Sequence, residues 1–123
     1  MWGRPIATLV IMLTACIGTS AMAQSPAYTW AGYGTNVPGS SKCPTYKMTI
    51  NVTVEGNSVK GRFAQEGRPE RHFEATKDAS GVFKTKAEVG GGGSMDVTGS
   101  VKDGDSKILL DGYCKFGGPL TRK

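Results

Sequence analysis

The chain has 123 residues, and its 15 Lys and Arg residues exceed its 10 Asp and Glu residues to give a formal net charge of +5. A chain of this length suits one small domain. The basic residues are interleaved with acidic ones and form no stripe with aromatic residues, so we expect no nucleic-acid binding. The positive net charge also allows attraction to an anionic envelope ligand.

Residues 1–23 have the pattern of a secretory signal peptide. One positive charge, Arg4, precedes an apolar run of about a dozen residues at 6–17, and small residues with the spacing Ala21-x-Ala23 follow. The run is too short for a transmembrane span, which needs about 20 apolar residues. We therefore expect cleavage before Gln24, no transmembrane span, and a periplasmic or secreted mature protein.

The same segment also supports an alternative, because residues 13–16 resemble the lipobox of bacterial lipoproteins. Cys16 would then be lipidated and would become the first residue of the mature protein. Several acyl chains on one cysteine would anchor the domain stably to a membrane. The apolar run continues past Cys16 and a better-formed cleavage site follows it, so a lipid anchor at Cys16 is the second interpretation.

Removal of residues 1–23 leaves two cysteines, Cys43 and Cys114. An even number of cysteines in an oxidising compartment predicts a disulfide. The bridge would close a loop of about 70 residues and would constrain the unfolded chain by about 4 kcal/mol. The alternative, a redox-active pair, lacks both a Cys-x-x-Cys motif and a neighbouring His.

The mature chain divides into an N-terminal arm and a β domain. Residues 24–42 are rich in Ser, Pro, Gly and Thr, and we expect an arm there with one short strand at 28–33. From Cys43 onward, strand patterns and turn signals follow one another, so we expect a β domain over residues 43–123.

The clearest strand of this domain is 46–55, where apolar and polar residues alternate as they do in a strand with one buried face. Gly56-Asn57 predicts a two-residue hairpin turn into a return strand at 58–65. Turn signals separate four further segments that predict strands, at 71–76, 82–89, 94–101 and 107–114.

These segments predict an all-β fold, an antiparallel up-and-down meander of about six to seven strands. The disulfide would tie the start of the first core strand to the end of the last one. Such strands lie at opposite edges of a meander unless the sheet curls, so the bridge favours closure into a small barrel. A two-layer β-sandwich, whose first and last strands can also lie close together, is the alternative.

Residues typical of catalysis or metal binding are scarce. His72 is the only histidine, and its place in the alternation of a predicted strand puts it on the outer face. Asp103-Gly-Asp105 fits a hairpin turn better than a calcium loop, and the four glycines at 90–93 fit a turn better than a phosphate loop. We expect no enzyme activity, no metal site and no cofactor.

Two segments offer candidate binding residues. The loop after residue 65 places Arg68, Arg71 and His72 close together in the sequence, where they could contact an anion or a carboxylate. Near the C-terminus Lys115 and Phe116 adjoin Gly-Gly-Pro, and an exposed Phe116 could anchor a partner. The alternative for both segments is ordinary solvated charge and an aromatic side chain that closes the sheet.

Several short motifs follow one another along the β domain. They are Cys43, Val59-x-Gly61, Val97-x-Gly99-x-Val101, Tyr113-Cys114-Lys115 and the basic end Arg122-Lys123. Together with the signal peptide, this arrangement resembles small secreted or periplasmic β-proteins of Gram-negative bacteria, over roughly residues 43–123. The resemblance implies a periplasmic or secreted β domain and transfers no catalytic residue.

We therefore expect an extracytoplasmic, non-enzymatic binding or interaction module. Its partner would be a protein, a glycan or an anionic envelope ligand, and small periplasmic inhibitors of lysozyme or proteases are one such class. A small hydrolase or lyase that acts on an envelope or host polymer is the first alternative. A structural component of the envelope is the second.

Overall fold

The computed structural model describes residues 25–35 and 42–123. The expected signal peptide at 1–23, the cleavage site at Gln24 and the lipid anchor expected as an alternative at Cys16 lie outside the described residues. Within them, the only helical element is the short 3-10 turn η2, Cys43–Thr45, and no helix is long and apolar enough to cross a membrane.

Two antiparallel sheets make up the described part of the chain. Sheet A has five strands in the order β4-β3-β2-β1-β9, and sheet B has four in the order β5-β6-β7-β8. The strands of sheet A are β1 (Ala27–Tyr33), β2 (Lys47–Glu55), β3 (Ser58–Gln65), β4 (Arg71–Thr76) and β9 (Thr121–Arg122). Those of sheet B are β5 (Val82–Gly90), β6 (Gly93–Ser100), β7 (Lys107–Asp111) and β8 (Lys115–Pro119).

The all-β prediction is confirmed, and the β2–β3 hairpin follows the sequence pattern closely. The even positions of β2 from Met48 to Val54 are buried, as the alternation predicts. Glu55 pairs with Ser58, so Gly56 and Asn57 form the expected two-residue turn. Gly56 has φ +63°, a backbone conformation that L side chains rarely adopt and that this turn requires.

The structure differs from the expected strands at both ends of the chain. The short strand expected within an arm is β1, which lies inside sheet A between β2 and β9, so the β domain extends beyond the boundary expected at Cys43. The strand expected to run to residue 114 ends at Asp111, and two unexpected strands, β8 and β9, follow. Gly117, Gly118 and Pro119 have low strand propensity, but pairing with β7 overrides it in β8.

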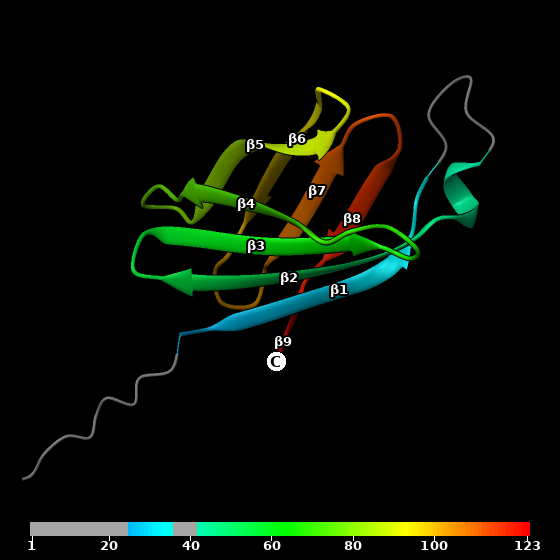
Figure 1. The fold of residues 1–123 in the computed structure, drawn as a ribbon. Coiled ribbons are helices and arrows are strands. Elements are labelled where there is room, and N and C mark those ends of the chain that lie inside the picture. Colours follow the sequence, from blue (N-terminus) through cyan, green and yellow to red (C-terminus); the bar gives the residue numbers. More distant parts are fainter. Residues whose placement is uncertain (1–24, 36–41) are drawn as a thin grey trace, which may run out of the picture.

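The hydrophobic core lies between the two sheets, whose strands cross obliquely in separate layers (Figure 1). Each sheet turns its alternating apolar residues inward, and the most deeply buried of them include Ile50 and Val59 in sheet A and Val97 and Leu110 in sheet B, all 0% exposed. This burial is the main force that holds one sheet on the other.

Cross-strand pairs of Gly and Phe shape one part of this core. Phe73 of β4 lies opposite Gly61 of β3, and Phe83 of β5 lies opposite Gly99 of β6. The two rings stack with a centroid distance of 6.3 Å and so join sheet A to sheet B. A Cβ at Gly61 would come within 2.1 Å of the Phe73 ring, so the glycine makes the room that this ring occupies.

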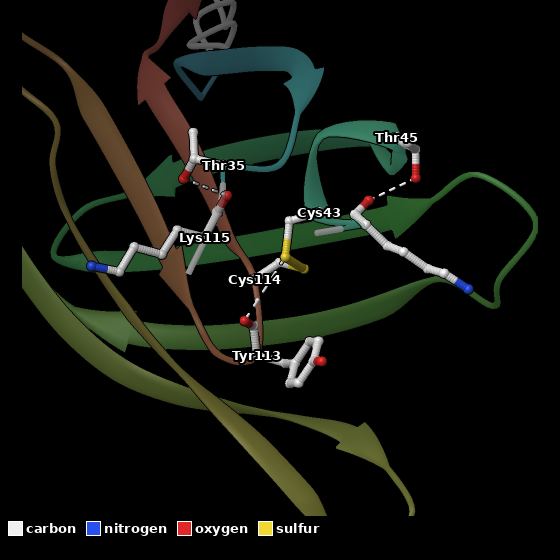
Figure 2. The surroundings of a disulfide bond; sticks show 7 residues. Thr35, Cys43, Thr45, Tyr113, Cys114 and Lys115 are labelled. Carbon is white, nitrogen blue, oxygen red and sulfur yellow. Dashed lines mark hydrogen bonds between the residues drawn. A yellow bond between two sulfur atoms is a disulfide. The ribbon is translucent and has the colours of Figure 1, made fainter. Parts of the chain in front are cut away.

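The expected disulfide between Cys43 and Cys114 is present, and it links the sheets at one end of the molecule. Cys43 belongs to η2, just before β2, and Cys114 belongs to the turn between β7 and β8 (Figure 2). Their Cα atoms lie 5.5 Å apart, although the residues are separated by 71 positions in the sequence.

The two sheets also meet beside this disulfide. Thr35, which follows β1, forms an isolated bridge with Lys115 of β8, and its backbone N–H donates to the Lys115 carbonyl oxygen at 2.9 Å. The Thr35 hydroxyl donates to the same oxygen at 3.4 Å (Figure 2). Strands β4 and β5 contact each other, but no ladder of paired residues joins them in the described part of the chain. Closure of the meander into a barrel therefore stays a prediction.

Candidate functional site

A pocket of about 310 Å³ opens between the two sheets at the end of the molecule that holds the disulfide. Its walls come from β2, β3 and the start of β4 on one side and from β5, β6 and β8 on the other. The β3–β4 and β7–β8 turns complete the rim. The volume lies at the lower end of the range found for small-molecule sites.

The floor of this pocket is apolar and comes from both sheets. Met48 and Phe63 point inward from sheet A, and Met95 and Phe116 point inward from sheet B, and all four are at most 8% exposed. Strand alternation explains these positions, because each residue takes an inward place in its strand. Methionine and phenylalanine together offer an adaptable, polarisable surface to an apolar group.

Arg71 brings a positive charge to the same space. It is the first residue of β4 and pairs across the ladder with Phe63, whose side chain points to the core. Paired residues lie on the same face of a sheet, so Arg71 also takes an inward place and lines the pocket, where it is half-buried. Its Nη2 atom lies 2.7 Å from where a Cβ on Gly90 would stand, so this glycine leaves space for the guanidinium.

Arg68 adds a second guanidinium at the rim. It lies in the turn after β3, where its backbone N–H donates to the Gln65 carbonyl oxygen at 2.9 Å. In the described part of the chain no carboxylate oxygen lies within 4.0 Å of the Arg68 or Arg71 guanidinium, and the lining of the pocket includes no Asp or Glu. The rim is therefore positively charged above an apolar floor.

The β7–β8 turn forms the wall opposite the arginines. Tyr113 is 75% exposed and projects next to the disulfide (Figure 2), and Cys114 itself lines the pocket. A Cβ on Gly112 would lie 2.9 Å from the Met95 Cβ, so the turn packs closely on β6. The disulfide thus holds this wall at a fixed distance from the start of β2.

The candidate binding residues from the sequence divide between this pocket and the outer surface. Arg68, Arg71 and Phe116 all line the pocket, although the sequence placed them in two separate segments. His72 lies on the outer face of sheet A, where its Nε2 atom is 3.3 Å from a Glu70 carboxylate oxygen. Lys115 is exposed on the outer face of β8, whereas Phe116 is only 4% exposed and so is not the exposed anchor that the sequence suggested, because its position in the alternation of β8 points inward.

Three residues of the pocket floor, Met48, Phe63 and Met95, are not among the candidate binding residues from the sequence. One signal for this site was present in the sequence. The alternation that places His72 outward also places Arg71 inward, and a charged residue on the inner face of a strand marks a cavity or a binding site.

Two other hollows and two perturbed carboxylates lie elsewhere. A wider hollow of about 680 Å³ covers the outer face of sheet B, where Gly117 has no side chain beside Leu109, and a third lies near Tyr28 and Arg122. Hydrogen bonds from the Ser80 hydroxyl and the Val82 N–H lower the pKa of Asp78, and the Lys86 ammonium group lowers the pKa of Asp96. These carboxylates do not line the inter-sheet pocket.

The inter-sheet pocket is the strongest candidate site because buried apolar side chains meet there with two guanidinium groups that pair with no carboxylate in the described part of the chain. No group of three or more His, Cys, Asp or Glu residues that could hold a metal ion occurs in residues 25–35 and 42–123. Comparison with protein-family models, with curated proteins and with solved structures returned no match, so the resemblance to small secreted β-proteins of Gram-negative bacteria stays a prediction.

Proposed function

We propose that this protein is an extracytoplasmic, non-enzymatic binding module and that the inter-sheet pocket is its binding site. The observation that carries the proposal is the combination of an apolar floor from both sheets with two guanidinium groups that have no carboxylate partner among residues 25–35 and 42–123. Sites for small molecules are typically apolar cavities with a few well-placed polar groups. We also propose that the two sheets are halves of one barrel and that the pocket is its open end.

An extracytoplasmic location is supported by two independent features. The disulfide between Cys43 and Cys114 is of the kind that persists in oxidising compartments. The first 23 residues have the pattern of a secretory signal peptide. A periplasmic or secreted protein would meet its ligand in the envelope or outside the cell.

A binding role is supported by the chemistry of the pocket lining. Its side chains are mainly apolar, aromatic or guanidinium groups, whereas general acid-base catalysis draws chiefly on His and carboxylates. The two alternatives, a small hydrolase or lyase and a structural envelope component, stay predictions. Ligand binding in the pocket would distinguish a binding module from both.

The experiment uses protein-observed NMR with a small-molecule library and a variant in which the pocket is filled. Gln65 is half-buried at the end of β3 and takes an inward place beside Met48, so Gln65→Trp would occupy the pocket. Thr49→Trp is the matched control, because Thr49 is exposed on the outer face of β2. We expect hits that shift the amide signals of pocket residues, that disappear in Gln65→Trp and that persist in Thr49→Trp.

Two results would contradict the proposal. Hits that map outside the pocket, or that bind Gln65→Trp as well as the original protein, would place the site elsewhere. Turnover of an envelope polymer that is lost in His72→Ala would instead favour the hydrolase or lyase.

A further inference from the structure

We infer that the pocket takes a small amphipathic oxyanion, a carboxylate or phosphate group carried on an apolar body. The head would lie between Arg68 and Arg71, and the body would lie on the apolar floor. This inference rests on the proposed function and adds the chemical class of the ligand to it.

Arg71 takes an inward place in β4, where its charge needs a partner. A guanidinium on the inner face of a sheet is partly withdrawn from water, and a charge in that position is costly unless a partner compensates it. Within the described residues no carboxylate lies within 4.0 Å of it, so the protein itself does not supply that partner. An oxyanion would do so through charge-assisted hydrogen bonds, which guanidinium groups form in a bidentate geometry.

The glycine turn between β5 and β6 lies beside the Arg71 guanidinium. Gly90 has φ +89°, and any side chain there would press on the Arg71 guanidinium, 2.7 Å from its Nη2 atom. The backbone of β5 therefore runs directly beside this group and restricts where it can move. A guanidinium held in place before the ligand arrives loses less side-chain freedom on binding.

The apolar floor determines the character and size of the ligand's body. Met48 and Phe63 from sheet A and Met95 and Phe116 from sheet B surround the space below the arginines. Burying an apolar body against them is favourable because it removes apolar surface from water. A volume of about 310 Å³ restricts the body to a short alkyl chain or a single ring system.

The absence of acidic residues from the pocket lining determines which head groups are rejected. An ammonium head would lie beside two guanidinium groups with no carboxylate in the lining to balance the repulsion. A neutral hydroxyl head would keep the apolar contacts but would form only ordinary hydrogen bonds. The pocket should therefore rank anionic above neutral above cationic heads on the same tail.

The test holds the tail constant and varies the head. Octanoate, octyl phosphate, octanol and octylamine are titrated into the protein at pH 7 and low salt, and dissociation constants are measured by NMR or calorimetry. We expect one or both anions to bind at least tenfold more tightly than octanol, because hydrogen bonds between charged groups are stronger than those to a neutral hydroxyl. Octylamine should bind most weakly. The two anions distinguish a carboxylate ligand from a phosphate ligand.

A charge-removing variant locates the head group. Arg71→Gln should weaken binding of the preferred anion at least tenfold and leave octanol binding unchanged. Arg62→Gln is the matched control, because Arg62 lies on the adjacent strand β3 with a side chain 57% exposed on the outer face. It should change the affinity by less than twofold. Circular dichroism and amide spectra of both variants verify that the fold is retained.

Octanol that binds as tightly as the anions, or an Arg71→Gln variant with unchanged anion affinity, would overturn the inference. The proposed function survives that result if other compounds occupy the pocket and Gln65→Trp excludes them. If no compound of any head group or library class occupies the pocket, both the inference and the proposed function are wrong.

Discussion

Replacement of Gly61 by Ala tests the packing that joins the two sheets. The added Cβ would lie 2.1 Å from two atoms of the Phe73 ring, whereas carbon atoms in contact are about 3.5–4.0 Å apart. The ring would have to withdraw by about 1.5 Å. Phe73 is only 4% exposed and lies between Phe63 and Phe83, with centroids 6.4 and 6.3 Å away, so it has little room to withdraw.

The expected loss of stability combines two opposing effects. Overpacking of a core costs about 1–3 kcal/mol, and replacement of a strand glycine by alanine returns about 0.5–1 kcal/mol. Because Phe73 has little room to withdraw, the upper part of the overpacking range applies, and the free energy of unfolding should fall by about 1–2 kcal/mol. With an m-value of about 1–2 kcal/mol/M for a small protein, the urea midpoint should fall by about 1 M.

The assay is urea unfolding followed by circular dichroism, with two matched variants. Gly93→Ala adds the same methyl group to a strand where its nearest neighbours would be 3.6 Å away, so the gain is unopposed and the free energy of unfolding should rise by about 0.5–1 kcal/mol. In the double variant Gly61→Ala/Phe73→Leu the loss should be smaller than the sum of the single losses. If Gly61→Ala unfolds at the same urea concentration as the original protein, the ring does not lie over this glycine and the reasoning is refuted.

Three further outcomes are expected. Replacement of both Cys43 and Cys114 by Ala should lower the free energy of unfolding by about 4 kcal/mol in the same assay, because the bridge spans 71 positions; a loss below about 1 kcal/mol would contradict this. The pKa of Asp78 is lowered from 3.8, first by the hydrogen bond from Ser80, so its stabilising effect is fully present above pH 3.8 and is lost as the pH falls through the lowered pKa. Asp78→Asn should therefore have a flatter pH dependence of the thermal midpoint in acid, and an unchanged profile would contradict it. The intact mass of the exported protein should match a chain that begins at Gln24 without acyl groups, and added acyl mass would establish the lipoprotein instead.

The strands that the sequence predicted are those with local signals. The β2–β3 hairpin has a long run of alternating residues and a two-residue turn whose first residue, Gly56, has a positive φ. Strand β8 has no such signal, because its Gly-Gly-Pro segment favours no strand by itself and becomes one only by pairing with β7. The Ser, Pro and Gly residues around β1 predict an arm, and its place inside sheet A comes from pairing with β2 and β9, which its own sequence does not indicate.

The candidate site could be predicted only in part, for a related reason. Nearness in the sequence grouped His72 with Arg71, and Lys115 with Phe116, but adjacent residues of a strand point to opposite faces of the sheet. The structure separates each of these pairs and unites Arg71 with Phe116 across the two sheets. Their place in one pocket depends on how one sheet lies on the other, and no local pattern in the sequence encodes it.

The disulfide connects the stability of the fold to the shape of the pocket. An apolar space between two sheets tends to close, because closure would bury the side chains that line it. Cys114 lies in one wall and is bonded to Cys43, which directly precedes the strand that forms the other, so the bridge fixes the spacing of the walls. Reduction would free the β7–β8 turn, with its exposed Tyr113, to move relative to β2. We therefore expect the pocket to be complete only where the disulfide persists, in the oxidising compartment that the signal peptide predicts.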